Sequence, residues 1–457
     1  MLNISNIREN YGVVYTPEKL VNNILDLIPI KYYCNPSLRW LDIGAGNGIF
    51  SINLYERLFK NLKSVIKDDE ERVKHIIKNM IFMVEILDEH IINLKTLFGN
   101  EANIIHDDFL NINSMNNMNN FDFIIGNPPF SSNGQIKTPT NNKISKKEDG
   151  KTVYKDFIVK SLELLKKDGY LNLIIPCLWL KPDKANLYNI LTDLTIEKLH
   201  CLSTNETQKL FNYTAQTPTC YFLIKNKENK DKLLRIFDKL ENDYIEYNLY
   251  NNFPIPTHGI NIINKLLKYV NKYGNLKVIK SSTISKNSKI STVKDENFNY
   301  INIKTCILEN NINPKLIYNY SNNELKFNTI PKLILAHKMY GFPFFDISGY
   351  YGISTRDNYI ITKKYYNMTE LEQLNNYLST KFALFMFSVT NYRMRLLEKY
   401  AFELIPDIIK IENFPDLKNL KREKRDEKIA NFFGFSENEI KYIENYSKNY
   451  NFFIDYN

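Results

Sequence analysis

A proline-rich stretch, Phe121 to Phe130 (FDFIIGNPPF), is the part of the sequence best suited to chemistry. An apolar run that predicts a buried strand ends there in Asn127, Pro128, Pro129 and Phe130. Because a proline nitrogen carries no hydrogen, these four residues offer more carbonyl acceptors than N–H donors, and the Asn127 side chain adds another carbonyl. Such a loop, followed by a ring, suits a planar ligand that bears an NH2 group, such as a nucleobase. The alternative is that the prolines only terminate the strand.

A glycine-rich stretch, Leu41 to Phe50 (LDIGAGNGIF), follows another predicted strand. Its glycines permit a tight turn and let a ligand approach the backbone before a helix begins. The stretch has no lysine like that of a phosphate-binding P-loop, and an acid precedes the turn. We therefore expect Asp42, Gly44 and Gly46 to lie at the cationic end of a ligand, such as an amino-acid ammonium group.

Two further acidic positions follow predicted strands. Glu85 ends the run IFMVE, where a carboxylate can accept hydrogen bonds from ribose hydroxyls, although an acid at a strand exit is also common. Asp107 or Asp108 follows ANIIH, and Phe109 comes next, so that an acceptor for an adenine amine would stand beside an aromatic ring. Ligands of open α/β sheets bind at the carboxyl ends of the strands. These positions predict a nucleoside site next to a second site for a planar amine.

The elements that must position these residues alternate between strands and helices in the first half. Strand-like runs are expected near 39–43, 81–85, 102–106, 121–125, 170–175, 196–201 and 219–224, with helical spacing between them, as at 154–167. This order predicts an α/β fold with seven strands in one mostly parallel sheet. Asp42 and Glu85 are farther apart than the ~20 residues usual between the first two strands. The charged run at 63–80 predicts an extra helix there.

The size and charge of the chain indicate two domains, with the basic residues concentrated in the second half. The chain has 457 residues, a mass of 54.0 kDa and a net charge of +9. Residues 226–457 hold 34 Lys or Arg against 26 Asp or Glu, and residues 261–304 hold nine lysines against two acids. This lysine-rich stretch either faces phosphates or is a solvated surface. No run suits a membrane span or a signal peptide, so we expect a soluble, intracellular protein in the cytoplasm or wherever its target resides.

The scattered cysteines and histidines predict neither a disulfide framework nor a metal site. The five cysteines form no CxxC pair, and the six histidines show no spacing typical of metal ligands.

Taken together, these stretches resemble the S-adenosylmethionine-dependent amino-methyltransferases, and more closely the γ-class N6-adenine DNA methyltransferases. In that class a Thr-Pro motif, the glycine-rich motif, NPP(Y/F) and a C-terminal target-recognition domain follow one another. VYTPEKLVNNILDLI at 14–28 resembles the first motif, although a Thr N-cap followed by Pro is also an ordinary helix start. The resemblance covers residues 11–225. It implies a Rossmann-like class I methyltransferase domain at 1–245 and an α+β DNA target-recognition domain at 246–457.

The resemblance also implies roles for individual residues. It implies an S-adenosylmethionine site lined by Thr16, Asp42, Gly44, Gly46, Glu85, Ile86, Asp108, Phe109 and Asn127. The catalytic loop would be Asn127, Pro128, Pro129 and Phe130, in which Asn127 and the Pro128 carbonyl hold the target amine and Phe130 stacks on the base. For a second aromatic beside the base, residues 210–224 offer Phe211, with Tyr213 as the second choice and core packing as the alternative for Phe211. The polar loop at 131–151 either closes over DNA or is simply solvated.

The implied activity is base flipping and N6-methylation of adenine in double-stranded DNA, as in a restriction-modification system. Any cognate restriction endonuclease would then be a separate chain. An RNA methyltransferase acting on adenine N6 or guanine N2, or a glutamine methyltransferase, would use the same motif. A non-catalytic DNA-binding subunit is a further alternative, but the glycine turn and NPPF are intact. The Thr-Pro motif and the basic second half favour DNA, and Asn127 favours adenine over cytosine. Only fourteen residues precede Tyr15, so we expect no nuclease domain before the first motif.

Overall fold

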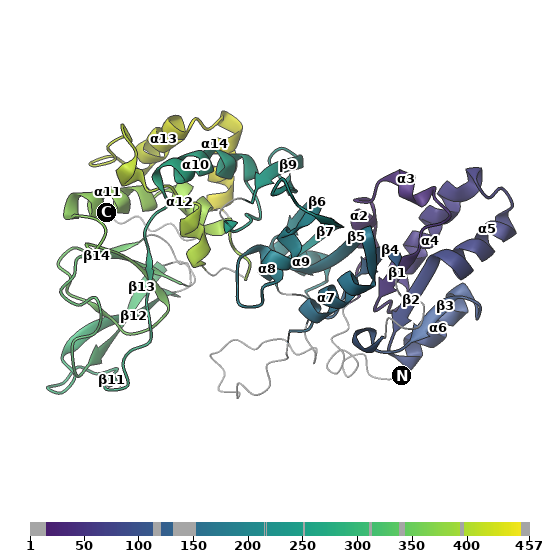
Figure 1. Cartoon of the computed structure of the whole chain (residues 1–457). Helices are drawn as coiled ribbons and strands as arrows, with labels where there is room; N and C mark the ends of the chain where they lie inside the picture. Colours follow the sequence, from purple (N-terminus) through teal and green to yellow (C-terminus); the bar gives the residue numbers. More distant parts are fainter. Residues whose placement is uncertain are drawn as a thin grey trace. The chain divides into compact units, whose positions relative to one another are not determined.

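The chain forms two compact units (Figure 1). The computed structural model describes residues 15–112, 120–130, 152–213, 215, 217–249, 252–309, 313–337, 343–393 and 397–448. Unit 1 comprises residues 1–237 and 244–251, and unit 2 comprises residues 238–243 and 252–457. Within the described ranges, none of the helices has both the length and the apolar character needed to cross a membrane.

Unit 1 is built on a nine-stranded sheet with the order β3-β2-β1-β4-β5-β7-β6-β8-β9. The strands are β1 (Trp40–Ile43), β2 (Ile81–Glu85), β3 (Asn103–His106), β4 (Phe121–Gly126), β5 (Leu165–Pro176), β6 (Leu194–Leu202), β7 (Thr219–Glu228), β8 (Leu233–Asp238) and β9 (Asp243–Asn248). The strands from β3 to β5 run parallel, and β7 is antiparallel to both of its neighbours. All seven predicted strands are present, which confirms the Rossmann-like methyltransferase fold. The short strands β8 and β9 were not expected.

Helices connect these strands in the alternating order that a parallel sheet requires. They are α2 (Glu18–Leu25), α3 (Ile30–Tyr33), α4 (Ile49–Asn61), α5 (Asp69–His75), α6 (Asp88–Phe98), α7 (Tyr154–Leu164), α8 (Leu187–Thr192) and α9 (Thr204–Leu210), with the shorter segments η1 (Leu62–Ser64), η2 (Ile76–Met80), η3 (Phe109–Asn111) and η5 (Cys177–Leu180). The insertion between β1 and β2 contains α5, which Asp68 caps by accepting from Glu71 N–H. The predicted extra helix is therefore confirmed, and it accounts for the long spacing from Asp42 to Glu85.

A stack of aromatic rings crosses one face of the sheet. Trp40 on β1 stacks on Phe123 of β4 with ring centroids 4.0 Å apart, and Phe123 stacks on Tyr170 of β5 at 5.1 Å. These residues are also direct partners in the strand pairing. Such rings would meet poorly if a strand slipped by one residue, because the slip would turn each ring to the other face. The stack therefore holds the carboxyl ends of these strands at one level.

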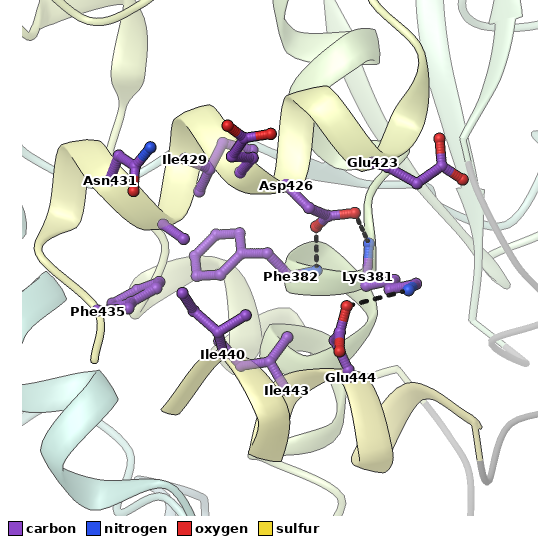
Figure 2. A pocket seen from close by; sticks show the side chains of 12 residues that line it. Lys381, Phe382, Glu423, Asp426, Ile429, Asn431, Phe435, Ile440, Ile443 and Glu444 are labelled. Carbon is purple, nitrogen blue, oxygen red and sulfur yellow. Dashed lines mark hydrogen bonds and ion pairs between the residues drawn. The ribbon is translucent and has the colours of Figure 1, made fainter. Parts of the chain in front are cut away.

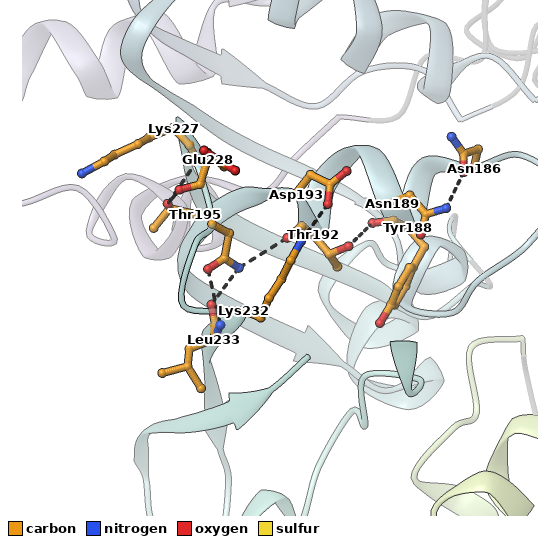
Figure 3. A network of polar contacts seen from close by, with 11 residues as sticks. Asn186, Tyr188, Asn189, Thr192, Asp193, Thr195, Lys227, Glu228, Lys232 and Leu233 are labelled. Atoms are coloured by element: carbon orange, nitrogen blue, oxygen red, sulfur yellow. Dashed lines mark hydrogen bonds and ion pairs between the residues drawn. The ribbon is translucent and has the colours of Figure 1, made fainter. Parts of the chain in front are cut away.

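A polar network fastens the added strand β8 to the end of α8 (Figure 3). Asn229 is buried in the turn after β7, and its side chain donates to the carbonyls of Thr192 and Leu233. Lys232 in the same turn binds Asp193 at 2.9 Å. Because these contacts join the turn to the end of α8, the chain direction after β7 is set before β8 begins.

Unit 2 divides into a β lobe, residues 279–366, and a helical lobe, residues 260–273 and 368–448. The β lobe has two four-stranded sheets, β10-β17-β14-β15 and β11-β13-β12-β16. Its strands are β10 (Ile279–Lys280), β11 (Ile290–Ser291), β12 (Tyr300–Glu309), β13 (Asn313–Ser321), β14 (Lys332–Ala336), β15 (Phe344–Asp346), β16 (Gly352–Ile353) and β17 (Asn358–Thr362). The helical lobe contains α10 (Ile260–Tyr273), α11 (Met368–Leu378), α12 (Lys381–Ser388), η7 (Lys399–Glu403), η8 (Ile408–Lys410), α13 (Arg422–Phe433) and α14 (Glu437–Lys448). This mixture confirms the expected α+β architecture of the second half.

Candidate active site in unit 1

The sheet brings the four chemically suited stretches to one edge. In the parallel pairing, Asp42 on β1 lies between Met83 of β2 and Ile125 of β4, and Glu85 at the end of β2 lies beside His106 of β3. The glycine turn, Glu85, the segment after β3 and the NPPF loop all follow the carboxyl ends of neighbouring strands. These stretches lie up to about a hundred residues apart in the sequence, and the register of the sheet brings them to the same edge.

The three glycines of the turn serve different purposes. All have positive φ: +72° at Gly44, +54° at Gly46 and +80° at Gly48. A Cβ on Gly48 would lie 2.8 Å from Leu94 Cδ2, so this glycine lets α6 pack on the start of α4. A Cβ on Gly44 would meet no atom within 4 Å. The space beside Gly44 is therefore open to a ligand.

Asp42 is a buried acid, and only one of its two carboxylate oxygens accepts a hydrogen bond among the described residues. Ser51 Oγ donates to Asp42 Oδ2 at 2.7 Å, whereas Asp42 Oδ1 is buried and has no hydrogen-bond partner in the described part of the chain. Gly126 permits this position, because a Cβ there would lie 3.2 Å from Oδ1. Burial raises the pKa of Asp42 to about 7, against the opposing effect of the Ser51 bond. A cationic group next to the glycine turn would satisfy this oxygen.

Glu85 holds the glycine turn from the neighbouring strand. Its Oε2 accepts from Gly46 N–H at 2.7 Å, and its Oε1 accepts from the N–H groups of Ile86 and Leu87. Burial raises the pKa of Glu85, but hydrogen bonds from His90 and the backbone amides outweigh it, so that the pKa is lowered and the group is ionised. A carboxylate has about four acceptor directions. The bonds leave one direction at Oε2 for a hydroxyl donor, as the role predicted for Glu85 requires.

His90 and Tyr15 join this cluster without having been predicted. His90 is buried, its Nδ1 lies 3.4 Å from Glu85 Oε1, and its Nε2 lies 3.2 Å from the Tyr15 hydroxyl. Nothing in the local sequence marks His90, because its contact depends on how α6 leaves β2. Tyr15 directly precedes Thr16, and this position beside the Thr-Pro motif was the one feature of the sequence that could have indicated Tyr15 as a site residue.

The segment after β3 differs in part from the expectation. Asp108 accepts from Leu110 N–H at 3.0 Å and so caps the short helix η3. Phe109 is 3% exposed and stacks on Phe157 of α7, with centroids 5.1 Å apart. It therefore has little free surface for a ligand. Ile86, which is 44% exposed, presents the larger apolar surface at this edge.

The NPPF loop contacts the Thr-Pro motif directly. Asn127 Nδ2 donates to Thr16 Oγ1 at 3.0 Å, and Thr16 is buried. The N-cap of α2 is Pro17, and the helix start has no side-chain cap. The alternative in which Thr16 is an ordinary N-cap is therefore wrong, and its hydroxyl serves the loop instead. Phe130 is half-buried and meets Tyr154 edge to face, with centroids 6.5 Å apart. The loop at 131–151 lies outside the described residues.

The two aromatics suggested for base stacking have different surroundings. Phe211 is 2% exposed and belongs to the hydrophobic core of unit 1. Tyr213 is 69% exposed and has a φ of +62°, which is uncommon for a tyrosine. A ring whose faces are covered by the core has no surface for a base. Tyr213 therefore exposes more ring surface than Phe211, which was the first choice from the sequence.

Unit 2 contains a separate cavity of about 160 Å³ between α12, α13 and α14 (Figure 2). Its apolar lining comes mainly from Phe382, Ile429, Phe435, Ile440 and Ile443. Asp426 accepts from the N–H groups of Lys381 and Phe382, and burial raises its pKa to about 6. Glu423, Glu427 and Glu444 line the same cavity. This many acids make it unsuited to phosphates, and the residues predicted to bind the cofactor and the base all lie in unit 1.

Comparison with known proteins finds a matched segment that contains the glycine turn, Glu85 and the NPPF loop. Residues 38–211 match the family model of the Eco57I restriction-modification methylases. An uncharacterised adenine-specific methylase of Mycoplasma pneumoniae is 25% identical, over 36% of this chain and 55% of its own. A protein of Methanocaldococcus jannaschii, whose name describes a type II restriction enzyme and methyltransferase, is 47% identical over 58 residues, which are 12% of this chain and 5% of its own. The matches confirm the resemblance of this segment to restriction-modification methylases.

A solved structure supports the fold over nearly the whole chain. The Type IIL restriction-modification enzyme MmeI, solved in complex with DNA, aligns with a TM-score of 0.51 at 14% identity and covers 98% of this chain and 80% of that one. At this identity the match concerns the fold. The chain spans about half the length of the Mycoplasma relative and about a twentieth of the Methanocaldococcus one.

Proposed function

We propose that this chain transfers a methyl group from S-adenosylmethionine to the N6 amine of adenine in double-stranded DNA. The observation that carries the proposal is the hydrogen bond from Asn127 Nδ2 to Thr16 Oγ1, because it joins the Thr-Pro motif to the NPPF loop beside the glycine turn. The match of residues 38–211 to restriction-modification methylases supports the same reaction.

The residues around the glycine turn fit S-adenosylmethionine. The amino-acid ammonium would satisfy Asp42 Oδ1, which is buried and lacks a partner in the described residues, and the open side of Gly44 would admit the ligand. Glu85 has an acceptor direction for a ribose hydroxyl, Ile86 offers apolar surface, and Asp108 follows at the end of the next strand. When bound, this cofactor supplies a methyl group that is electrophilic because it is attached to a positively charged sulfur.

The NPPF loop would hold the target amine. The Asn127 side-chain oxygen and the Pro128 carbonyl accept its two hydrogens, which draws the nitrogen lone pair away from the ring and stabilises the charge that develops on nitrogen. Phe130 and Tyr213 would stack on the base. A paired base cannot reach such a loop, so the adenine is flipped out of the duplex. Catalysis then rests on placing the nitrogen against the methyl carbon.

The two parts of the chain would divide the work. Residues 1–245 would carry catalysis and residues 246–457 would recognise the target sequence, because the net positive charge lies in the second part. We further propose that the methyl mark protects DNA from a cognate restriction endonuclease. The description of the matched family as restriction-modification methylases suggests this partner.

The deciding experiment identifies the methylated nucleoside. Purified protein is incubated with S-adenosylmethionine and unmethylated double-stranded DNA, with RNA in parallel, and the nucleosides are analysed by mass spectrometry. N6-methyladenine in DNA is the expected product, and Asn127→Ala should abolish it while leaving cofactor binding nearly unchanged. Methylation in RNA alone would overturn the assignment to DNA, and 4-methylcytosine would overturn the assignment to adenine.

The same experiment tests the non-catalytic alternative. Cofactor binding without any product would indicate a subunit that needs another chain. Resistance of the methylated DNA to a nuclease that cuts at the modified sequence, found by sequencing the marks, would test the protective role.

A further inference from the structure

We propose that the ribbon formed by β12 and β13 enters the major groove of DNA and reads base edges there. This inference rests on the proposed function, and it names the element of unit 2 that contacts the target. We define the ribbon as residues 305–309 of β12 together with residues 313–317 of β13. It consists of two antiparallel strands (Figure 1).

The ribbon extends beyond the sheet from which it starts. β16 pairs with β12 only at Asn302 and Ile303, and β11 pairs with β13 only at Tyr320 and Ser321. Among the described strand pairings, the ribbon residues pair only with each other. A two-stranded ribbon with no strand on either side has the width that a groove can accept.

A β-bulge marks the base of the ribbon. The pairing shifts between Ile303 and Thr305, so that Lys304 is the extra residue. The carbonyl of Lys304 accepts hydrogen bonds from Thr355 Oγ1 and Asn358 Nδ2. Because the bulged residue is anchored to the rest of the β lobe, the direction of the ribbon is set by the fold. Bulges also increase the local twist of a strand pair, and the grooves of DNA are themselves twisted.

The two faces of the ribbon differ in character. Leu316 packs against the core of the β lobe, and its partner Cys306 is also partly buried. The next pair along the ribbon, Ile307 and Lys315, lies on the opposite face and is exposed. The face away from the core therefore carries an apolar side chain beside a cation. An apolar group can contact a thymine methyl, and a lysine can bind a phosphate or a guanine edge.

In the described residues of unit 2, the exposed large apolar side chains all lie in the β lobe, to which the ribbon belongs. They are Val293, Ile307, Tyr318, Ile330, Ile347, Tyr350 and Tyr365. The ring of Tyr318 stacks on that of Tyr351, and the ring of Tyr350 contacts Tyr351 in an edge-to-face arrangement. The partly exposed rings of Tyr318 and Tyr350 thus both lie against Tyr351, where they can contact apolar groups of a ligand.

Charge favours the same lobe. The β lobe has twelve Lys or Arg against six Asp or Glu, a net charge of +6, whereas the larger helical lobe has sixteen against thirteen, a net charge of +3. Lys265 in α10 forms an ion pair with Glu439 of α14, so this lysine of the lysine-rich stretch joins two helices. DNA, as a polyanion, would therefore be drawn to the β lobe rather than to the acid-lined cavity of the helical lobe.

The dimensions of the ribbon suit the major groove. Five residue pairs at about 3.4 Å each give a length of about 17 Å, which exceeds the depth of the groove, and neighbouring strands lie about 5 Å apart. The major groove of B-DNA is about 12 Å wide and admits a two-stranded ribbon, whereas the minor groove is about half as wide.

Dimethyl sulfate footprinting tests the inference, because this reagent methylates guanine N7 in the major groove and adenine N3 in the minor groove. The full-length protein is bound to DNA that contains its target sequence. We expect protection of guanine N7 over a few adjacent base pairs. The triple variant Lys304→Gln, Ile307→Ala, Lys315→Gln should lose that protection and lower the slope of log affinity against log salt by about 2.

A matched variant separates the ribbon from general electrostatic attraction. Lys268→Gln with Lys272→Gln removes the same charge from exposed positions on α10 and should keep the guanine N7 protection. Cofactor affinity and thermal unfolding of the triple variant establish that it folds. Unchanged N7 protection in the triple variant, or loss of protection in the α10 variant alone, would overturn the inference.

The footprint also keeps this inference distinct from the proposed function. If the wild-type protein yields N6-methyladenine but the ribbon variant behaves like wild type, the inference fails and the proposed function stands. If no DNA is methylated and no DNA is bound, both fail.

Discussion

Asn127 Nδ2 donates a hydrogen bond to Thr16 Oγ1 across 3.0 Å, although the two residues lie 111 positions apart in the chain. The bond fastens the amide of the NPPF loop to the segment that leads into α2. Because prolines 128 and 129 already restrict the backbone, the remaining freedom of the loop lies largely in the Asn127 side chain. The contact removes that freedom, and it orients the amide before any ligand arrives.

Thr16→Val should therefore slow methyl transfer while leaving the fold intact. Valine has nearly the same shape as threonine but cannot accept a hydrogen bond, so a partly buried amide loses its partner at a cost of about 1–3 kcal/mol. This corresponds to a fall in the single-turnover rate of roughly 5- to 150-fold. Thr16→Ser keeps the hydroxyl and should retain most of the rate. Equal rates in both variants would show that the contact does not position Asn127.

Cofactor binding should weaken as the pH falls below 7. Burial raises the pKa of Asp42 to about 7, so the free protein carries a neutral Asp42 below that pH and an ionised one above it. An ammonium group needs the ionised form. The affinity for S-adenosylmethionine should be highest between about pH 7 and 8, where Asp42 is ionised and the ligand amine is still protonated, and should fall up to tenfold per pH unit below about pH 6. Calorimetric titration from pH 5 to 9 measures this.

Asp42→Asn is the control for that pH profile. The amide cannot ionise, so the variant should bind the cofactor more weakly at pH 8 and show a flat profile between pH 5 and 8. A profile that keeps its slope in the variant would assign the titration to another group.

Tyr213 and Phe211 should respond differently to truncation. Phe211→Ala should lower the free energy of unfolding by about 3–5 kcal/mol, because the ring is buried in the core. Tyr213→Ala removes an exposed ring and should change stability by less than about 0.5 kcal/mol. It should reduce the fluorescence increase of 2-aminopurine placed at the target base, which reports flipping. A wild-type fluorescence response in Tyr213→Ala would remove Tyr213 from the base site.

The buried ion pair of unit 2 should be needed for its stability. Lys332 Nζ lies 2.5 Å from Asp346 Oδ2, and both side chains are at most 1% exposed. Asp346 also accepts from the backbone N–H groups of Tyr350 and Tyr351. Asp346→Leu should therefore lower the free energy of unfolding by about 3–5 kcal/mol, because it leaves a buried lysine without its counter-ion and two backbone amides without an acceptor.

Lys332→Met provides the comparison for the ion pair. It leaves the two hydrogen bonds from backbone N–H groups to Asp346 in place, so it should lower the free energy of unfolding by less than Asp346→Leu does. Urea unfolding of the full chain measures both variants, and cofactor affinity serves as the control for unit 1. An equal loss of unfolding free energy in both variants would show that the backbone hydrogen bonds to Asp346 contribute nothing to stability.

The seven strands around the site and the order of the motifs could be predicted from the sequence alone. Alternating apolar runs and glycine or proline punctuation act over a few residues, so they can be read locally. Asp42, Glu85 and Asn127 could be assigned to strand ends for this reason. Strands β8 and β9 were missed because they lie at the end of the sheet, where partly exposed residues give a weak apolar pattern.

Which side chains meet could not be predicted from the sequence and follows from the tertiary fold. The Asn127–Thr16 bond and the Glu85–His90–Tyr15 cluster join residues from different elements, and their distances follow from sheet register and helix packing. The sequence assigned Phe211 and Tyr213 to one role, because both stand in the same short segment. Burial separated them, since which ring faces the core depends on how the chain turns after α9. Contacts between distant segments arise from the whole fold, and no local pattern encodes them.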